Sequence, residues 1–144
     1  MTNKKLSWSA KYELGIEDID FQHHFFLDLI NRLSNALNEP RNHSYQARLI
    51  SELNAYARFH FISEENMMLH TDYPQFSEHK NHHDDLLEQL SIRENMLDMK
   101  HSEEEIAGIL KFLSEWFFHH TVSEDRLFSE YLKEKYGKLH SFNL

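Results

Sequence analysis

Seven residues with metal-binding side chains lie at spacings that helices would gather into one site. They are His23, His60, Glu64, His79, His83, His120 and Asp125. His60 and Glu64 are four residues apart, as are His79 and His83. On a helix each of these pairs occupies one face. Five imidazoles and two carboxylates are about what two iron ions need as ligands, whereas a single tetrahedral zinc ion would need only four.

Each part of this pattern also has a purely structural explanation. Two histidines four residues apart arise readily by chance in a chain with 12 histidines. His60 and Glu64 alone would more often be a surface pair, and His23 or His120 alone a core histidine with a hydrogen-bond partner. The combination favours metal, because burying at least six such groups in an apolar core without partners would cost several kcal/mol.

Asp125 fits the pattern least well. It follows His120 by five residues, which is a rotation of about 140° around an ideal α-helix. Two explanations stay open. Asp125 bridges to a second ion beside His120, or a local distortion of the helix turns both side chains inward.

Helices must position these residues, and the sequence predicts four. Only 3 Gly and 2 Pro occur in 144 residues, which disfavours a turn-rich β fold. Apolar residues recur at intervals of three or four in segments at about 18–37, 44–69, 77–99 and 103–131. The last segment either continues through Tyr131 or gives way to a second short helix. Pro40 and Pro74 mark breaks, Ser77 or a near neighbour is the expected cap of the third helix, and Gly137 ends the fourth.

Ser102 is the expected N-cap of the fourth helix, with Glu105 reaching back in a capping box. Four helices joined by short links predict an all-α, up-down-up-down four-helix bundle, in one domain over residues 1–144. An irregular arm, residues 1–17, precedes the bundle, which extends over about 18–135 and leaves a short C-terminal tail. Short links make neighbouring helices antiparallel, so the seven residues, which alternate between helix starts and helix ends, are expected at one end of the bundle.

The composition excludes several classes of function. The chain has no Cys, so disulfides, iron–sulfur clusters, thiolate zinc sites and cysteine nucleophiles are excluded. A formal net charge of −9 argues against nucleic acid or an anionic membrane as a partner. No segment has the apolar length of a signal peptide core or a membrane span. These features indicate a cytoplasmic protein, and they point to no particular protein partner.

The same residues stand in four strings that resemble the motifs of the hemerythrin family. The strings are Asp20-Phe21-Gln22-His23, then His60-Phe61-Ile62-Ser63-Glu64-Glu65, then Tyr73-Pro74 leading to His79-Lys80-Asn81-His82-His83, and Trp116 leading to His120 and Asp125. The resemblance covers the chain from Trp8 to about Tyr131. Four motifs in the same order make it specific, and the single-domain bacterial branch of the family is the most similar.

The resemblance implies a non-haem di-iron site that binds O2 reversibly, in a carrier, store or delivery protein rather than an enzyme. The two iron ions would differ in their histidines, with His79, His83 and His120 on one ion and His23 and His60 on the other. Glu64 and Asp125 would bridge the ions, together with an oxo or hydroxo group. O2 would bind at the open position of the two-histidine iron.

The proposed O2 pocket is lined by Phe26, Phe61, Trp116, Phe117 and Thr121. Thr121 departs from the family pattern, in which isoleucine is common at this position. Its hydroxyl would either hold a water or donate a proton and so speed oxidation of the iron, or bond back to the carbonyl oxygen of Phe117, as helical threonines often do.

Two other functions would use the same site: a di-iron oxidase or peroxidase, and a sensor of O2 or redox state that acts through a protein partner. A spectrum that reverses when O2 is removed would separate a carrier from an enzyme that turns over. The remaining polar residues are expected outside the site. Surface or solvated positions are predicted for His24, His43, His70, His82, His101, His119 and His140. Glu65 is expected to point away from Glu64.

Overall fold

The structure, a computed structural model, describes residues 6–39 and 42–137. Five α-helices account for most of the described chain. They are α1 (Glu17–Ala36), α2 (His43–His70), α3 (Phe76–Met99), α4 (Glu103–His119) and α5 (Asp125–Tyr136). A π-helical segment, His120–Glu124, joins α4 to α5, and a short 3-10 turn, Ala10–Tyr12, precedes α1. No helix within these ranges is long and apolar enough to cross a bilayer.

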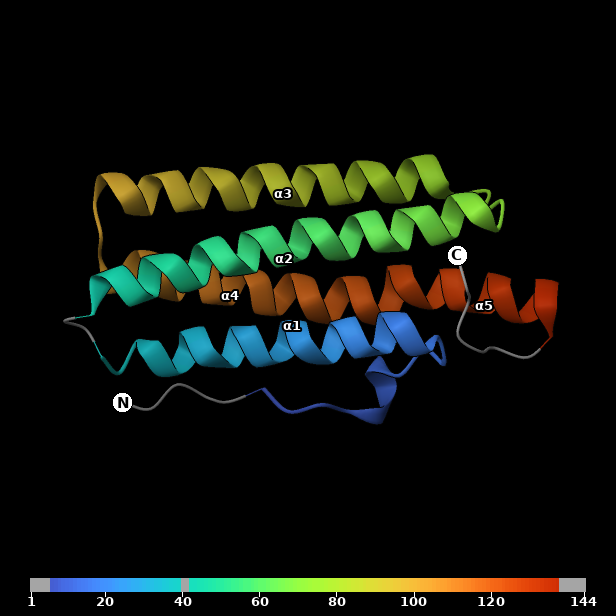
Figure 1. The fold of residues 1–144 in the computed structure, drawn as a ribbon, viewed down its shortest axis with the longest axis horizontal. Helices are drawn as coiled ribbons and strands as arrows, with labels where there is room; N and C mark the ends of the chain where they lie inside the picture. The colour runs from blue at the N-terminus through green and yellow to red at the C-terminus, as the bar shows by residue number, and fades with distance from the viewer. Residues whose placement is uncertain (1–5, 40–41, 138–144) are drawn as a thin grey trace.

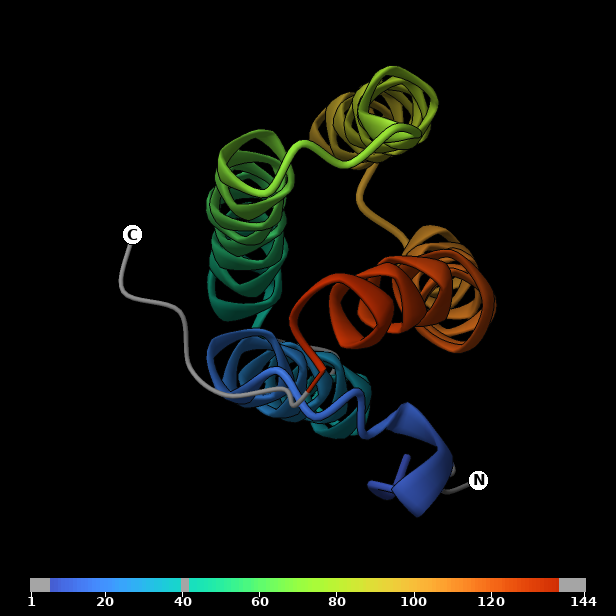
Figure 2. The ribbon, with the colours of Figure 1, turned by 90° about the vertical axis from the view of Figure 1, so that its right-hand side faces the viewer.

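The helices form the predicted up-down-up-down bundle. Figure 1 shows α1, α2, α3 and α4 lying side by side with alternating directions, and α5 continuing the line of α4. In the end-on view of Figure 2 each helix packs against two neighbours, so that α1 contacts α2 and α4, and α3 contacts α2 and α4. This arrangement confirms the all-α fold.

The helix ends follow from local sequence. The Ser102 hydroxyl accepts a hydrogen bond from the Glu105 backbone N–H at 3.1 Å, so the predicted cap of the fourth helix is confirmed. Gly137 ends α5 with φ +81°, in the left-handed region that favours glycine. The third helix begins earlier than Ser77, at Phe76, because the chain turns directly after Pro74. The predicted break at Pro40 lies outside the described residues, and α1 ends at Ala36.

The core is apolar along the length of the bundle. Each bundle helix contributes a fully buried leucine to this core. They are Leu33 of α1, Leu53 of α2, Leu90 of α3 and Leu113 of α4. Burying a leucine side chain stabilises a fold by about 1.5–3 kcal/mol. These buried leucines fix how far along the bundle axis each helix lies relative to its neighbours. That alignment determines which polar side chains of different helices lie at the same level.

The described part of the N-terminal arm, from Leu6 onward, packs along α1 and α4. The side chain of Asn31 on α1 exchanges two hydrogen bonds with the backbone of Leu6, at 2.8 and 2.7 Å. Trp8 stacks on His24 with ring centroids 3.6 Å apart. Tyr12 is buried with its ring 5.4 Å from that of Phe117. The described part of the arm therefore covers some of the surface where α1 meets α4.

Candidate metal centre

One buried cluster is formed by residues of α1, α2 and α3 and by the π segment and α5 that continue α4. α1 provides a histidine from its first half, α2 a histidine and a glutamate from its last third, and α3 two histidines from its first turns. The π segment begins with the fifth histidine, and α5 begins with the aspartate. These residues are His23, His60, Glu64, His79, His83, His120 and Asp125, and none is more than 3% exposed. The structure thus brings together all seven residues that the sequence singles out, and their binding of metal stays a prediction.

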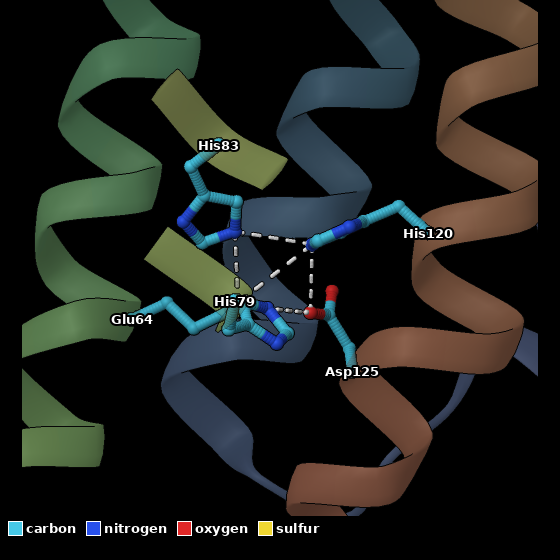
Figure 3. Close-up of side chains that lie close together, drawn as sticks. All are labelled: Glu64, His79, His83, His120 and Asp125. Atoms are coloured by element: carbon cyan, nitrogen blue, oxygen red, sulfur yellow. Dashed lines mark hydrogen bonds and ion pairs between the residues drawn. The ribbon is translucent and has the colours of Figure 1, made fainter. Parts of the chain in front are cut away.

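The first part of the cluster contains three imidazoles. His79 Nε2 lies 2.7 Å from Glu64 Oε1 and 3.1 Å from Asp125 Oδ1. His120 Nε2 lies 2.9 Å from the same Asp125 oxygen and 3.1 Å from His83 Nε2. Figure 3 shows these side chains converging from different helices. Their ligand atoms lie within 4.8 Å of one another, as binding to one ion requires.

The second part contains two imidazoles and the same two carboxylates. His23 Nε2 lies 3.1 Å from His60 Nε2 and 3.1 Å from Asp125 Oδ2. His60 Nε2 lies 3.7 Å from Glu64 Oε2. Each carboxylate therefore turns one oxygen toward the three-histidine group and the other toward the two-histidine group. This is the arrangement of a carboxylate that bridges two metal ions.

The π segment explains how Asp125 reaches the cluster. The backbone N–H of Asp125 donates to the carbonyl oxygen of His120, five residues earlier, instead of four as in an α-helix. The wider turn offsets the rotation that would carry Asp125 away from His120 on a regular helix. Of the two explanations left open by the sequence, local helix distortion is thus observed, and it also places Asp125 between the two histidine groups.

Buried polar atoms in the cluster lack other partners, which tests whether the residues fit metal ions. Among the described residues, the carboxylate oxygens Glu64 Oε2 and Asp125 Oδ2 are buried without a hydrogen bond. Leaving such atoms unsatisfied costs about 1–3 kcal/mol each. Two imidazole nitrogens bound at ~2.1 Å in adjacent octahedral positions lie about 3 Å apart, and the 3.1 Å contacts between Nε2 atoms match that spacing. The donor set therefore fits metal ions bound by the two groups of histidines and the carboxylates that they share.

The buried charges shift the proton affinities of the cluster. Burial alone opposes the charge of the carboxyl groups, but hydrogen bonds from the imidazoles hold the pKa of Glu64 and of Asp125 well below their usual ranges. Burial likewise opposes protonation of the imidazoles. At His79 and His120, hydrogen bonding and attraction to the two carboxylates outweigh the effect of burial. They raise the pKa values of these imidazoles to about 10 and about 9. At His60 burial prevails and lowers the pKa to about 3.

Metal uptake should therefore release protons. The pKa values of His79 and His120, about 10 and about 9, lie above 7. At pH 7 in the metal-free protein both rings are therefore protonated on both nitrogens and positively charged. Metal ions bind only the neutral ring, so we expect roughly two protons to leave per chain at pH 7 and almost none above pH ~10.5. Calorimetry of Co²⁺ binding in buffers with different ionisation enthalpies measures this number. Equal proton release at both pH values would contradict the assignment.

Two side chains outside the cluster orient its histidines. His83 Nδ1 lies 2.7 Å from Glu65 Oε2, and His60 Nδ1 lies 2.7 Å from Gln22 Oε1. Donation of each Nδ1–H to its oxygen leaves the Nε2 lone pair free to face the cluster. Glu65 points away from Glu64, as predicted, but the sequence analysis missed its role: its carboxylate reaches the adjacent helix α3 and contacts His83. Gln22 precedes His23 in the first motif, and that position was its only sequence signal.

Replacing Glu65 by alanine should weaken metal binding about 10- to 100-fold, because His83 would lose the group that fixes its tautomer. Glu65→Gln keeps an oxygen that can accept the Nδ1–H, so its loss should be smaller. Glu52→Ala, at an exposed position of the same helix, is the matched control. Competition with a chelator measures the affinities, and an unchanged affinity in Glu65→Ala would remove this residue from the site.

Aromatic side chains surround both groups of histidines. Phe61 stacks on His83 with centroids 3.9 Å apart, and Trp116 stacks on His120 at 4.5 Å, so both lie against the three-histidine group. Phe117 lies 5.8 Å from His23, edge to face, and Phe26 stacks on Phe117 at 6.0 Å. Phe61 also contacts the two-histidine group, with its ring 5.6 Å from that of His60, so these aromatic residues lie against both groups rather than lining one pocket.

Thr121 follows His120 in the π segment and is 1% exposed. Its hydroxyl oxygen has no hydrogen-bond partner within the described part of the chain. The bond to the carbonyl oxygen of Phe117, one of the two alternatives that the sequence left open, is therefore not made. The π segment changes the geometry on which that expectation depended, since regular helical turns bring a threonine hydroxyl to the carbonyl four residues earlier.

The other histidines lie outside the cluster. His24, His82 and His119 are exposed, as predicted, and His82 contacts Glu124 at 3.3 Å. The prediction was wrong for His101. This residue is half-buried at the opposite end of the bundle, with Nε2 2.7 Å from Gln46 Oε1 and its ring stacked on His43. His43 and His70 are exposed, and His140 lies outside the described residues.

Comparison with known proteins shows which family of proteins this chain is similar to. Residues 14–132 match the family model described as the hemerythrin HHE cation binding domain. A bacteriohemerythrin of Clostridium acetobutylicum is 31% identical over 125 residues, which cover 83% of this chain and 95% of that protein. Bacteriohemerythrins of Stenotrophomonas maltophilia and Pseudomonas aeruginosa are 27% and 28% identical, over 89% and 93% of this chain and 82% and 86% of theirs. The matched segment includes all seven clustered residues.

Proposed function

Because the chain belongs to the hemerythrin family, we propose that it binds O2 reversibly at a non-haem di-iron site. The observation that carries the proposal is the sharing of Glu64 and Asp125 by two sets of imidazoles, three on one side and two on the other. Imidazole and carboxylate are ligands that suit iron. The side with fewer histidines offers fewer protein ligands, so an ion there would keep a coordination position for O2, and the chain would serve as a carrier, store or delivery protein.

Each part of the site has a role in this function. The histidines would hold the ions, and the two carboxylates would bridge them and balance their charge. Glu65 and Gln22 would keep two of the imidazoles in the metal-binding tautomer. When bound, the iron pair would supply the electrons that O2 takes up and returns. The stacked rings of Phe26 and Phe117 would form an apolar wall that keeps water from the two-histidine side. Without water there, competing proton transfer would be prevented.

Reduced protein exposed to O2 and then to low O2 pressure tests the proposal. The absorption spectrum should change on oxygenation and return when O2 is removed, over repeated cycles with constant iron content. Irreversible oxidation in a single exposure would contradict reversible binding.

An enzyme is the second candidate, and a groove favours it. The groove lies between α3 and α4, has a volume of about 240 Å³ and reaches Trp116 and His120 from a rim that includes His82 and Glu124. Such a groove would admit a small substrate or reductant to the three-histidine side. Continuous O2 consumption with added reductant, at more than one O2 per site, would support the enzyme over the carrier.

The hydroxyl of Thr121 should speed oxidation of the bound iron. It is buried beside His120 with no partner among the described residues, so it would hold a water or donate a proton where a dry site is needed. Thr121→Val keeps the shape and should slow autoxidation roughly several-fold with unchanged iron content. Thr121→Ser keeps the hydroxyl and should retain the wild-type rate. An equal or faster rate in Thr121→Val would remove the hydroxyl from the mechanism.

A further inference from the structure

The two groups of histidines differ in the charge of the residue that contacts one imidazole of each group from outside. On the three-histidine side, His83 Nδ1 lies 2.7 Å from a carboxylate oxygen of Glu65. On the two-histidine side, His60 Nδ1 lies 2.7 Å from the amide oxygen of Gln22. The two contacts have the same length, but one acceptor is an anion and the other is neutral.

Both acceptors are held in place by their surroundings. Gln22 is half-buried, and its Nε2 donates to Ser63 Oγ at 3.0 Å. Its backbone carbonyl accepts a hydrogen bond from the Tyr56 hydroxyl at 3.0 Å, so α2 holds this residue at two points. The Glu65 side chain is only 13% exposed and interacts electrostatically with Lys80 of α3. Each acceptor is therefore ordered enough to act on the imidazole that it contacts.

The charge of the acceptor changes the imidazole as a metal ligand. A hydrogen bond from Nδ1–H to a carboxylate is stronger than one to a neutral amide. The proton is drawn toward the anion, which leaves more electron density on Nε2 and makes the ring a more basic ligand. A more basic ligand binds a divalent ion more tightly and favours the higher oxidation state of iron. His83 is therefore expected to be a stronger ligand than His60.

We propose that Gln22 is a positioning residue that keeps the two-histidine side the more weakly binding half of the site, through its neutral contact with His60. Glutamine at this position withholds from His60 the negative charge that Glu65 supplies to His83. The three-histidine side then fills first. The inference concerns metal binding and does not require O2. One consequence, that the neutral acceptor slows permanent oxidation of the iron that meets O2, rests on the proposed function.

Stepwise binding of Co²⁺ to the full chain, followed by competition with a chelator, tests the proposal. Gln22→Glu should tighten the weaker of the two binding steps roughly tenfold. The Ser63 hydroxyl can donate to the new carboxylate as readily as it accepts from the amide, so the contact with His60 should stay in place. Glu65→Gln should weaken the tighter step roughly fivefold and leave the weaker step unchanged.

Two further variants separate the contact from the added charge. Combining Gln22→Glu with Glu65→Gln exchanges the acceptors at constant net charge, and should reduce the ratio of the two dissociation constants roughly 50-fold, the product of the two single effects. Phe21→Glu is the matched control. It adds the same charge one residue away, at a position that is 74% exposed, where solvent screens it, so neither step should shift by more than about twofold.

A purely structural role for Gln22 predicts a different result. In that case Gln22→Glu and Gln22→Leu would both bind Co²⁺ less tightly than the wild type, whereas the proposal expects tighter binding in the first and weaker binding in the second. Proton NMR of the Co²⁺-loaded protein assigns the steps, because the Nδ1–H of a bound histidine has its own strongly shifted signal. Gln22→Glu should move a signal that appears in the weaker step.

A weaker step that is unchanged in Gln22→Glu, or changed no more than in Phe21→Glu, would overturn the proposal. If Gln22→Glu does not fold, Glu65→Gln decides, and an unchanged tighter step would overturn the proposal. Co²⁺ replaces iron in all of these measurements, so they hold whether or not the iron protein binds O2. Irreversible oxidation of the iron protein with the expected Co²⁺ affinities would contradict the proposed function alone.

Discussion

Replacing His79 by alanine should empty the three-histidine side of the site. His79 Nε2 contacts both shared carboxylates, at 2.7 Å from Glu64 and 3.1 Å from Asp125. Without it, the iron content should fall from about two ions per chain to one or fewer. The metal-free variant should also lose stability, by roughly 3–5 kcal/mol, because two buried carboxylates lose the imidazolium that balances them.

His82→Ala is the matched control for His79→Ala. His82 lies on the same helix α3 but is exposed, and its contact is with Glu124 at the surface. The control should keep two iron ions per chain and its melting temperature. Retention of two ions in His79→Ala, as measured by elemental analysis after removal of free metal, would contradict the ligand assignment.

Replacing His23 by alanine should abolish the reversible O2 spectrum. His23 is the only member of the cluster on α1 and one of two imidazoles on the side proposed to bind O2. The apolar face of α1 is otherwise unchanged, so the far-ultraviolet circular dichroism should stay that of a helical bundle. The side with three histidines should still hold an ion, because its ligands come from other helices.

His24→Ala provides the comparison for His23→Ala. His24 is exposed and stacks on Trp8 of the N-terminal arm, so its loss should leave oxygenation intact. An oxygenation curve for His23→Ala with the wild-type midpoint would show that α1 contributes no ligand, and the two-histidine side would have to be assigned again.

The bundle could be predicted from the sequence because its signals are local and repeated. Apolar residues at intervals of three and four fix which face of each helix is buried, and short links fix antiparallel directions. The four predicted helices correspond to α1, α2, α3 and the α4–α5 line. The common height of the seven clustered residues follows from those two facts, without any knowledge of side-chain contacts.

The helix distortion at the site could be anticipated but not placed. The five-residue step from His120 to Asp125 indicates that a regular α-helix would turn one of the two outward. Nothing in the sequence of the segment, His120–Glu124, such as a proline or glycine, marks a π-helical turn. The turn is sustained by the packing of the buried residues around it, and that packing exists only in the assembled bundle.

Contacts between neighbouring helices account for the features that the sequence did not reveal. Glu65 was expected to turn away, and it does so within α2, but its carboxylate meets His83 of α3. His101, in the link between α3 and α4, was expected in solvent, yet its ring lies 2.7 Å from the side chain of Gln46 on α2. In both cases the partner depends on the heights and rotations of two helices together. Single-helix periodicity does not supply that information.

The iron content of the purified protein tests the central claim most directly. Protein produced with ample iron and freed of loosely bound metal should contain about two iron ions per chain by elemental analysis, because the two groups of histidines share both carboxylates and each group has ligands for one ion. One zinc ion per chain and no iron, under the same conditions, would contradict a di-iron site and the O2 binding proposed from it.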